Sequence, residues 1–252
     1  AEQVERLCRK YGPPDILESQ EYLGIAYYTL QRKLRDPDFL RGVPVVLNLH
    51  SPDFLLREYN EEPRFQFPIY WYGRMERFCM LAADRVIAPS RYLARQAVEL
   101  MDEPQFRAQA FPLPWTDVSD YRTGPGEDGE VLYIGRLELR KGVLSLIDGC
   151  VRLWEEGTSF RLSLAGGDTH YFPRGMSMKA WIDRRYGRWI ESGHLRVLGN
   201  LDQEALFQTI TSAAVAVIPS LWENFPNTCM EAMALRRVVV GSRHGGHSEM
   251  IG

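Results

Sequence analysis

Hydrophobic positions along the chain come in short runs that alternate with longer amphipathic segments. The runs are rich in valine, isoleucine and leucine and are bounded by proline, glycine or charged residues, which is typical of buried strands. The segments between them repeat apolar residues three and four positions apart, as helices do. Alternation of this kind predicts an α/β fold with parallel sheets and helices on both faces.

The first half of the chain contains three predicted strands, at 14–18, 43–50 and 86–88. Predicted helices cover 2–11, 22–34 and 67–83, and a further helix follows the third strand and ends near Met101. In the helix at 67–83, one stripe is apolar and is predicted to face the core. The stripe consists of Trp71, Met75, Phe78 and Ala82.

The second half repeats the alternation. Its predicted strands are 131–134, 161–165, 195–198, 215–218 and 238–242, and its predicted helices are 143–156, 179–186, 203–212 and 229–235. Between the halves, the region from Phe111 to Gly129 holds three prolines and three glycines, which indicates a linker. We therefore expect two α/β domains, at 1–112 and 130–252, joined by a linker at 113–129.

The segment from Val215 to Glu231 is the most informative part of the chain. The apolar strand stops at Pro219, a loop carries Glu223, and Pro226 marks the start of a helix that places Glu231 about one and a half turns inside. With the strand at 238–242, this makes a βαβ unit, whose ligands bind beyond the carboxyl ends of the strands. The helix start offers unpaired backbone N–H groups, which suit a phosphate or a sugar oxygen.

Composition narrows the class of protein. The chain has 252 residues, is 45% apolar and 25% charged, and carries a net charge of −3, as a soluble globular protein does. This balance lacks the basic footprint of a nucleic-acid-binding protein, and no apolar run approaches the ~20 residues that cross a bilayer. The four cysteines, Cys8, Cys79, Cys150 and Cys229, are scattered, which predicts free thiols and a cytoplasmic location.

Three stretches carry a resemblance to a known family. The run 223–234, followed by Val238-Val239 and by Gly245-Gly246 with Glu249, resembles the signature of the retaining GT-B glycosyltransferases called family 4. The stretch 131–137 with Lys141-Gly142 is similar to the strand-to-helix diphosphate site of that family, and 83–90 to the last strand of its first domain. The resemblance implies two Rossmann-like domains, the first on the acceptor side and the second binding a nucleotide sugar.

The resemblance also implies roles for charged residues. Arg136 and Lys141 match the residues that contact the donor's phosphates, where arginine provides a planar fork and lysine a point charge. Glu231 matches the glutamate that holds the ribose hydroxyls, and Glu223 the glutamate that faces the transferred sugar. Without the downstream motif, the two cations would fit an ordinary charged helix start, and the glutamates would fit simple stabilisation of a helix dipole.

Further candidates complete the expected site. Asn224, Phe225, Asn227 and Thr228 form the rest of the donor-binding set, and the backbone N–H groups of the last three are expected to meet sugar or phosphate oxygens. His50, at the end of the predicted strand 43–50, is by family likeness a catalytic candidate that touches the sugar from the first domain. A lone histidine at a strand end also fits a purely structural role.

Two motifs that suggest metal binding are set aside. Asp36-Pro37-Asp38 has the D-x-D form of metal-dependent transferases, but its proline and its position after a helix predict a surface turn. His244 and His247 are three positions apart without an evident third ligand. We therefore predict no metal site, and no cofactor apart from the nucleotide-sugar donor, which is UDP- or GDP-linked.

The predicted function is transfer of a sugar from a nucleotide-diphosphate donor to an acceptor hydroxyl, with retention and metal independence implied by the resemblance. The acceptor is left open among a saccharide, a lipid-linked molecule and a small molecule, and so is peripheral contact with the inner face of the membrane. Two alternatives remain, a nucleotide-sugar epimerase of GT-B build and a non-catalytic nucleotide-sugar-binding module. The chain begins in a helical pattern without methionine and ends where a helix should start. We expect an internal segment in which both domains are partial.

Overall fold

The computed structural model describes residues 1–114, 124 and 126–251 of the chain. These residues form two compact units, one of residues 1–58 and 63–113 and the other of residues 59–62 and 114–252. Much of the predicted linker at 113–129, namely 115–123 and 125, lies outside the described residues. The linker as such stays a prediction, but the first strand of the second unit begins at Glu127, four residues before the predicted start at Val131.

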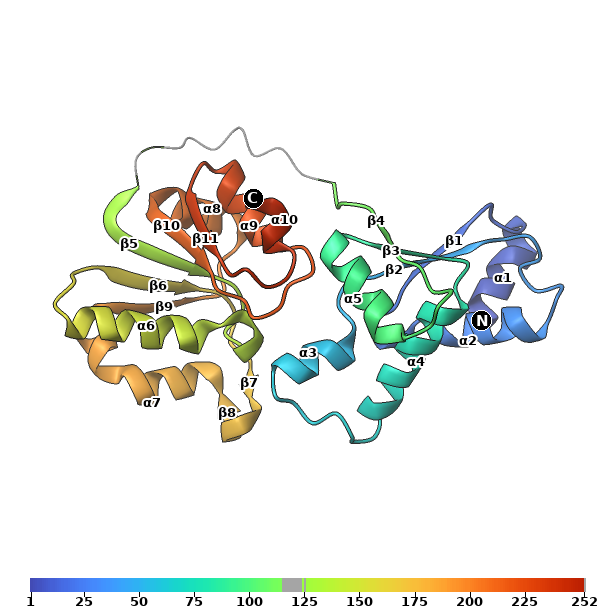
Figure 1. Ribbon diagram of the computed structural model, residues 1–252, viewed down its shortest axis with the longest axis horizontal. Coiled ribbons are helices and arrows are strands. Elements are labelled where there is room, and N and C mark those ends of the chain that lie inside the picture. The colour runs from blue at the N-terminus through green and yellow to red at the C-terminus, as the bar shows by residue number, and fades with distance from the viewer. Residues whose placement is uncertain (115–123, 125, 252) are drawn as a thin grey trace. The chain divides into compact units, whose positions relative to one another are not determined.

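The first unit is built on a four-stranded parallel sheet, in the order β1-β2-β3-β4 (Figure 1). Its strands are β1 (Leu17–Gln20), β2 (Val45–Asn48), β3 (Arg85–Ala88) and β4 (Gln109–Ala110). The register pairs Leu17 with Val45 and Val46 with Arg85. Alternate side chains of β2, Val45 and Leu47, are completely buried, as the period of two in a strand requires.

Short helices connect these strands. They are α1 (Glu2–Tyr11), the 3-10 helix η1 (Tyr22–Gly24), α2 (Tyr27–Arg35), α3 (Asp53–Tyr59), α4 (Ile69–Ala82) and α5 (Arg91–Met101). The single helix predicted at 22–34 is divided, because Leu23 has φ 54° and cannot continue a right-handed helix. Helix α3 was not predicted, since its seven residues give too short a periodic signal.

The apolar stripe predicted on α4 faces the core only in part. Trp71 is 55% exposed, whereas Met75, Phe78 and Ala82 are partly buried. The fully buried positions of the helix are Glu76, Cys79 and Met80. The buried face thus includes a carboxylate, which binds backbone amides and which hydrophobicity alone assigns to the surface. The cysteines are free thiols, with Cys8 partly buried and the other three buried.

The second unit is built on a five-stranded parallel sheet in the order β11-β10-β5-β6-β9. The strands are β5 (Glu127–Ile134), β6 (Arg161–Ala165), β9 (Leu195–Gly199), β10 (Ala213–Ile218) and β11 (Val238–Gly241). A small antiparallel pair, β7 (His170–Tyr171) and β8 (Met176–Ser177), flanks the 3-10 helix η3 (Phe172–Arg174). Strand β11, predicted to be buried, is an edge strand whose Val238 and Val240 are exposed.

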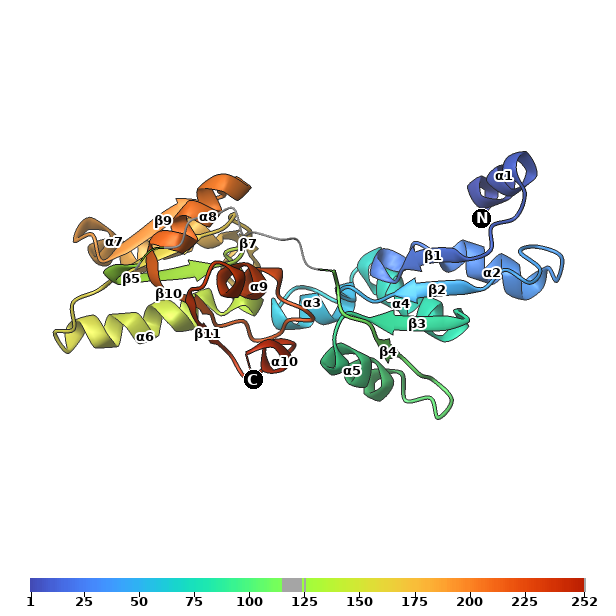
Figure 2. The ribbon, with the colours of Figure 1, turned by 90° about the horizontal axis from the view of Figure 1, so that it is seen from above.

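Helices cover both faces of this sheet. They are the 3-10 helix η2 (Leu139–Lys141), α6 (Val143–Glu155), α7 (Met178–Glu191), α8 (Gln203–Ser212), α9 (Asn227–Ala234) and α10 (His247–Met250). One core cluster joins α6 and α7 to one face, and a second joins α8 and α9 to the other. Figure 2 shows α6 and α8 on opposite sides of β5. The predicted three-layer α/β fold is confirmed. None of the described helices is both long enough and apolar enough to cross a membrane.

Candidate functional site

The predicted site residues of the second unit follow the ends of two neighbouring strands. Strand β5 ends at Ile134 and strand β10 at Ile218, and the two are paired in parallel through Val217 and Tyr133. Because the carboxyl ends of parallel strands share one edge, the segments after them meet there. The meeting brings Lys141 and Glu223 into a direct ion pair between Nζ and Oε1.

A glycine at the start of α6 permits this approach. Gly142 has φ +71°, and a Cβ at this position would lie 2.2 Å from the carbonyl oxygen of Pro219. The N–H of Leu221 donates to the carbonyl of Arg140 at 2.7 Å, which fixes the two segments to each other. The Lys-Gly pair of the sequence is therefore a packing requirement as well as a source of charge.

An arginine that sequence reasoning missed lies at the centre of the site. The guanidinium of Arg140 donates to Glu138 at 2.7 Å, to Glu223 at 3.2 Å and to the carbonyl of Trp222 at 2.9 Å. The side chains of Glu138, Arg140 and Glu223 are each no more than 7% exposed. Arg136, by contrast, is 58% exposed and reaches Glu138 at 3.3 Å. The site thus contains a buried ionic cluster with one outward-facing cation.

Burial and neighbouring charge act in opposite directions on this cluster. Burial by itself raises the pKa of Glu223, but the charges of Lys141 and Arg140 outweigh it, so the pKa lies below its ordinary value. Burial lowers the pKa of Lys141, and the charge of Glu223 opposes that change. Each of the two groups thus favours the charged form of the other.

The start of α9 offers unsatisfied backbone donors. Pro226 caps the helix, and the N–H groups of Asn227 and Thr228 have no acceptor within the parts of the chain that the structure describes. The N–H of Phe225 donates to Oδ1 of Asn224 at 2.5 Å, so it is already engaged here, and its role as a donor to a ligand stays a prediction. Two of the three expected backbone donors therefore remain available.

Glu231 lies on the fifth position of α9, as the sequence predicts. Its Oε2 atom is buried, and no hydrogen-bond donor for it exists among the described residues. Burial raises the pKa of this carboxyl group. A buried acceptor without a partner is rare in folded proteins and marks a position where a ligand can supply the missing donor.

The loop after β11 packs directly on the segment of Glu223. The N–H of Gly246 donates to the carbonyl of Glu223 at 2.9 Å, and a Cβ on Gly246 would lie 2.1 Å from the carbonyl of Asn224. His247 is buried with Nδ1 against the carbonyl of His244 at 3.1 Å, and burial lowers its pKa. The described residues contain no group of three metal-ligating side chains, here or elsewhere.

His50 belongs to the first unit, where it follows strand β2. Its N–H and that of Ser51 donate to the buried carboxylate of Glu21, at 2.7–2.9 Å. A second buried carboxylate, Glu76 of α4, accepts from the N–H groups of Leu23 and Asp53, each at 2.9 Å. The loop that carries His50 is thus held in place through its backbone.

Neither of these two carboxylates forms an ion pair within the part of the chain that the structure describes. Burial raises the pKa of Glu21 to about 7, although hydrogen bonds from the backbone of His50 and Ser51 work against it. Burial likewise raises the pKa of Glu76 to about 7. Sequence reasoning placed Glu21 only in a loop, 19–24, that could shape the acceptor site, and it missed Glu76. The sequence does place Glu76 among the apolar positions of α4. However, a buried glutamate cannot be told from a solvent-exposed one by sequence alone.

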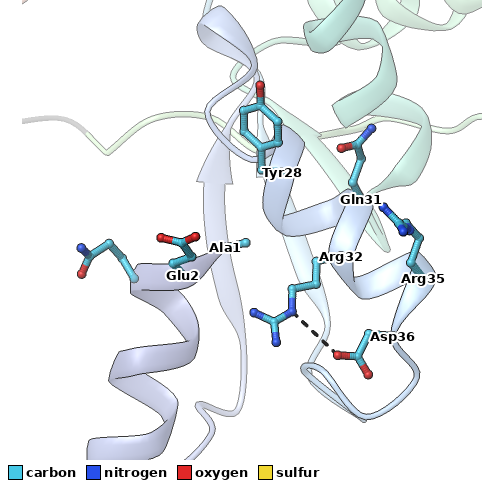
Figure 3. Close-up of a pocket in the computed structure, with 8 residues that line it drawn as sticks. Ala1, Glu2, Tyr28, Gln31, Arg32, Arg35 and Asp36 are labelled. Carbon is cyan, nitrogen blue, oxygen red and sulfur yellow. Dashed lines mark ion pairs between the residues drawn. The ribbon is translucent and has the colours of Figure 1, made fainter.

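A large hollow elsewhere in the first unit carries little chemistry. It measures about 760 Å³ and lies between the start of α1 and helix α2 (Figure 3). Its central cation, Arg32, is paired with Asp36 at 3.7 Å and with Glu5 at 2.5 Å. Arg32 is thus neutralised, and no buried polar atom without a partner is found among the described residues that line the hollow, so it is not the candidate site.

Known proteins resemble both halves of the chain. Residues 1–107 match the family described as Glycosyltransferase Family 4, and residues 128–252 match Glycosyl transferases group 1. A glycogen synthase of Mycobacterium tuberculosis (strain CDC 1551 / Oshkosh) is 32% identical over 130 residues, which are 52% of this chain and 29% of that protein. A D-inositol 3-phosphate glycosyltransferase of Nocardia farcinica is 28% identical over 193 residues, covering 70% of this chain and 41% of the relative.

A solved structure supports the fold. A sucrose-phosphate synthase from Thermosynechococcus elongatus superimposes with a TM-score of 0.72 at 22% identity, covering 97% of this chain and 60% of that one. Its similarity shows the GT-B fold alone. The chain spans between 29% and 52% of the length of the curated relatives that it matches. The two family matches and the fold together show that the chain belongs to the family 4, or group 1, glycosyltransferases of GT-B fold.

Proposed function

We propose that this chain carries the working part of a glycosyltransferase that moves a sugar from a nucleotide-diphosphate donor to an acceptor hydroxyl. One observation carries the proposal. At one edge of the second unit's sheet, a buried lysine–glutamate pair, two unsatisfied helix-start amides and an unpartnered carboxylate come from adjacent segments. These groups suit the parts of a nucleotide-sugar donor, namely the diphosphate, the ribose and the transferred sugar.

The departing diphosphate needs positive charge and N–H donors. Lys141 and the outward-facing Arg136 supply the charge, and the N–H groups of Asn227 and Thr228 supply donors at a helix start. Glu223 keeps Lys141 protonated in a buried position, so the cation is in place before the donor arrives. Charge that is fixed in advance stabilises a leaving group without reorganisation during the reaction.

The remaining groups suit the sugar portions of the donor. Oε2 of Glu231 lacks a partner and is able to accept from the ribose hydroxyls, whereas Asn224 and Glu223 lie on the segment assigned to the transferred sugar. The carboxylate of Glu223 itself is turned toward its two cations, so its contact with the sugar requires a rearrangement of the pair. A UDP- or GDP-linked donor is proposed.

Retention of configuration, metal independence and the part of His50 as a catalytic residue are also proposals. Buried and exposed cations, with the helix start, offer the charge that a divalent ion supplies in other transferases. Proton NMR of the product measures the anomeric coupling that distinguishes retention from inversion. Turnover in excess EDTA checks the independence from metal. We also propose that the enzyme is cytoplasmic and that its acceptor is a saccharide, a lipid-linked molecule or a small molecule.

The main test compares two lysines in the full-length protein. Lys141→Gln is expected to lower turnover by about a hundredfold or more, as loss of one electrostatic stabiliser typically does. Lys179→Gln, which removes an exposed lysine paired with Asp183, is the control and should leave turnover unchanged. Equal rates in the two variants would refute the assignment of the donor site.

Two alternative functions, epimerase and non-catalytic binding module, are tested with the same purified protein. An epimerase would convert the donor sugar in the absence of any acceptor, which sugar analysis of the recovered nucleotide detects. A binding module would bind UDP or GDP, measured by calorimetry, but would transfer no sugar with any acceptor. Binding that Glu231→Gln weakens, together with transfer, supports the transferase.

A further inference from the structure

A second charged cavity lies entirely within the first unit, on the side of α3 and α4. It measures about 330 Å³, and four arginines line it together with aromatic rings. The four are Arg57, Arg64, Arg74 and Arg77, and the rings include Phe65 and Tyr70. We call this cavity the arginine pocket. Four cations around so small a volume repel one another, so binding of an anion in the pocket would be electrostatically favourable.

The nearby carboxylates neutralise only part of this charge. Arg57 pairs with Asp53 at 2.5 Å, and Arg64 pairs with Glu58 at 2.8 Å. Arg74 and Arg77 form no ion pair among the described residues. Arg77 is held by one hydrogen bond to the carbonyl of Leu100 at 2.9 Å and lies over the ring of Phe54. Among the described residues these two guanidinium groups therefore lack a direct ion pair, and only Glu76 offsets part of the charge of Arg77.

The proximity of Arg74 also affects the pKa of Arg77. Burial lowers its pKa, and the charge of Arg74 lowers it further. A structural arginine is normally surrounded by acceptors that favour its charged form. On the same helix the charge of Glu76 favours the charged form of Arg77, and the charge of Arg74 opposes it more strongly. An anionic ligand would reverse this balance, because it would favour the charged form of both residues.

The pocket is joined to the loop that carries His50. Helix α3, which contributes Arg57, begins at Asp53, only three residues after His50. Glu76 of α4 binds the N–H groups of Asp53 and Phe54, at 2.9 and 3.4 Å. Since Arg74 and Arg77 flank Glu76 on the same helix, the pocket and the His50 loop share one support.

Arginine and aromatic groups together indicate the kind of ligand. Guanidinium groups bind phosphate oxygens through paired, directional hydrogen bonds, which makes arginine the usual residue for phosphate recognition. Phe65 is 82% exposed, and its ring lies 6.4 Å from that of Tyr70, so the pair offers an apolar surface at the pocket. A phosphate joined to a polyol or sugar ring has both the charge and the apolar C–H face to match.

We propose that the arginine pocket binds the phosphate group of the acceptor, so that the substrate receiving the sugar is a phosphorylated saccharide or polyol. The inference rests on the proposed transferase function, because it assigns the acceptor class of that reaction. The phosphate is either soluble or carried on a lipid headgroup, and the pocket recognises the same chemistry in both.

The test measures binding of phosphorylated probes to the full chain. Calorimetry compares glucose 6-phosphate and glycerol 3-phosphate with glucose and glycerol, and sedimentation compares phosphatidylcholine vesicles with and without phosphatidic acid. We expect phosphate-bearing probes to bind and Arg74→Gln to weaken them at least tenfold. Arg6→Gln, an exposed arginine on α1, is the matched control and should bind like the unaltered chain.

Each outcome decides a different point. Binding of the soluble phosphates, lost in Arg74→Gln, supports a soluble acceptor, and binding only to phosphatidic acid vesicles, lost in the same variant, supports a lipid-borne phosphate. Equal binding of charged and uncharged probes, or equal effects of Arg74→Gln and Arg6→Gln, overturns the proposal. UDP titrated into the same variants reports the second unit independently. If the proposed donor site is wrong, UDP does not bind. If only the proposal for the arginine pocket is wrong, UDP still binds.

Discussion

The two units bury carboxylates in opposite ways. In the second unit, Glu223 is surrounded by the cations Lys141 and Arg140, which hold its pKa below the ordinary value despite burial. In the first unit, Glu21 and Glu76 are surrounded by backbone N–H groups, and burial raises the pKa of each to about 7. Backbone dipoles position a carboxylate, but in these two sites they do not offset its loss of hydration.

The difference has a functional meaning. Charges on side chains can exchange partners when an anionic donor enters, because Lys141 is able to turn from Glu223 toward a phosphate. Backbone N–H groups cannot exchange without moving the loop, so Glu21 and Glu76 fix the geometry around His50 and Asp53. We therefore interpret the second unit as the site of charge compensation and the first as a scaffold for positioning.

The largest effect is expected from the central arginine of the second unit. Arg140→Met leaves Glu138 and Glu223 buried without their shared partner, and breaking a buried pair in this way costs about 3–5 kcal/mol of unfolding free energy. Urea denaturation followed by tryptophan fluorescence measures the loss. Arg188→Met removes an exposed pair with Glu155 and should cost at most about 1 kcal/mol.

Similar losses in both variants would contradict the distinction between a buried cluster and a surface pair. We further expect Arg140→Met to cost less unfolding free energy when Glu138→Gln is also present. In the double variant only one of the two buried carboxylates loses the arginine, and the coupling between the two changes measures the interaction directly.

The next largest effect is a dependence of stability on pH that has opposite sign in the two units. The folded pKa of Glu21 and Glu76 is above the unfolded value of 4.5, so the folded first unit binds more protons between pH 4.5 and about 7. Its free energy of unfolding should fall as pH rises through that window, by about 3 kcal/mol for each group. Hydrogen exchange at Leu47 and Leu49, corrected for intrinsic rates, measures this slope.

Glu21→Gln should remove half of the slope in the first unit and Glu76→Gln the other half. Glu223 behaves in the reverse sense, because its lowered pKa contributes stability that is present above the unfolded value and lost on acidification. The second unit should therefore weaken as pH falls below about 4.5. A first unit whose stability rises with pH would show that backbone donors do compensate the buried charge.

The sequence predicts the parts of this comparison that depend on periodicity. The strands at 161–165 and the helix at 203–212 have the predicted bounds, and Glu231 lies inside a helix that begins just after Pro226. The proximity of Lys141 and Glu223 also follows from sequence, because parallel strands bring their carboxyl ends to one edge.

The buried charges could not be predicted in the same way. Glu138 and Arg140 alternate with leucine and lysine in a short segment that would fit an exposed turn. They are buried by residues that are distant in the sequence, namely Asn60, Trp222 and Glu223. Glu76 is likewise buried by residues of other elements. Burial of a charge is decided by distant neighbours, whereas periodicity describes only the local chain.

A moderate effect on stability is expected in the loop after β11, where Gly246 packs on the segment of Glu223. In Gly246→Ala the new Cβ would meet the carbonyl of Asn224 at 2.1 Å, so the backbone must shift, at a cost of about 1–3 kcal/mol. The shift should also lower UDP binding. Gly187→Ala, inside α7 with open space around it, is the control and should raise stability by up to about 1 kcal/mol. Unchanged stability in Gly246→Ala would show that the loop is not fixed by this contact.

The smallest effect on stability, and the sharpest on binding, is expected for Glu231→Gln. Its Oε2 has no partner in the ligand-free chain and burial raises its pKa, so replacement by a neutral amide removes an unfavourable charge and should change the unfolding temperature little. If the unpartnered oxygen awaits ribose hydroxyls, the thermal shift produced by UDP should nevertheless largely disappear, because stabilisation by a ligand follows its affinity. Glu204→Gln, at the exposed start of α8, should keep the full shift. A Glu231→Gln variant that keeps the UDP shift would leave the buried oxygen without a role in binding the donor.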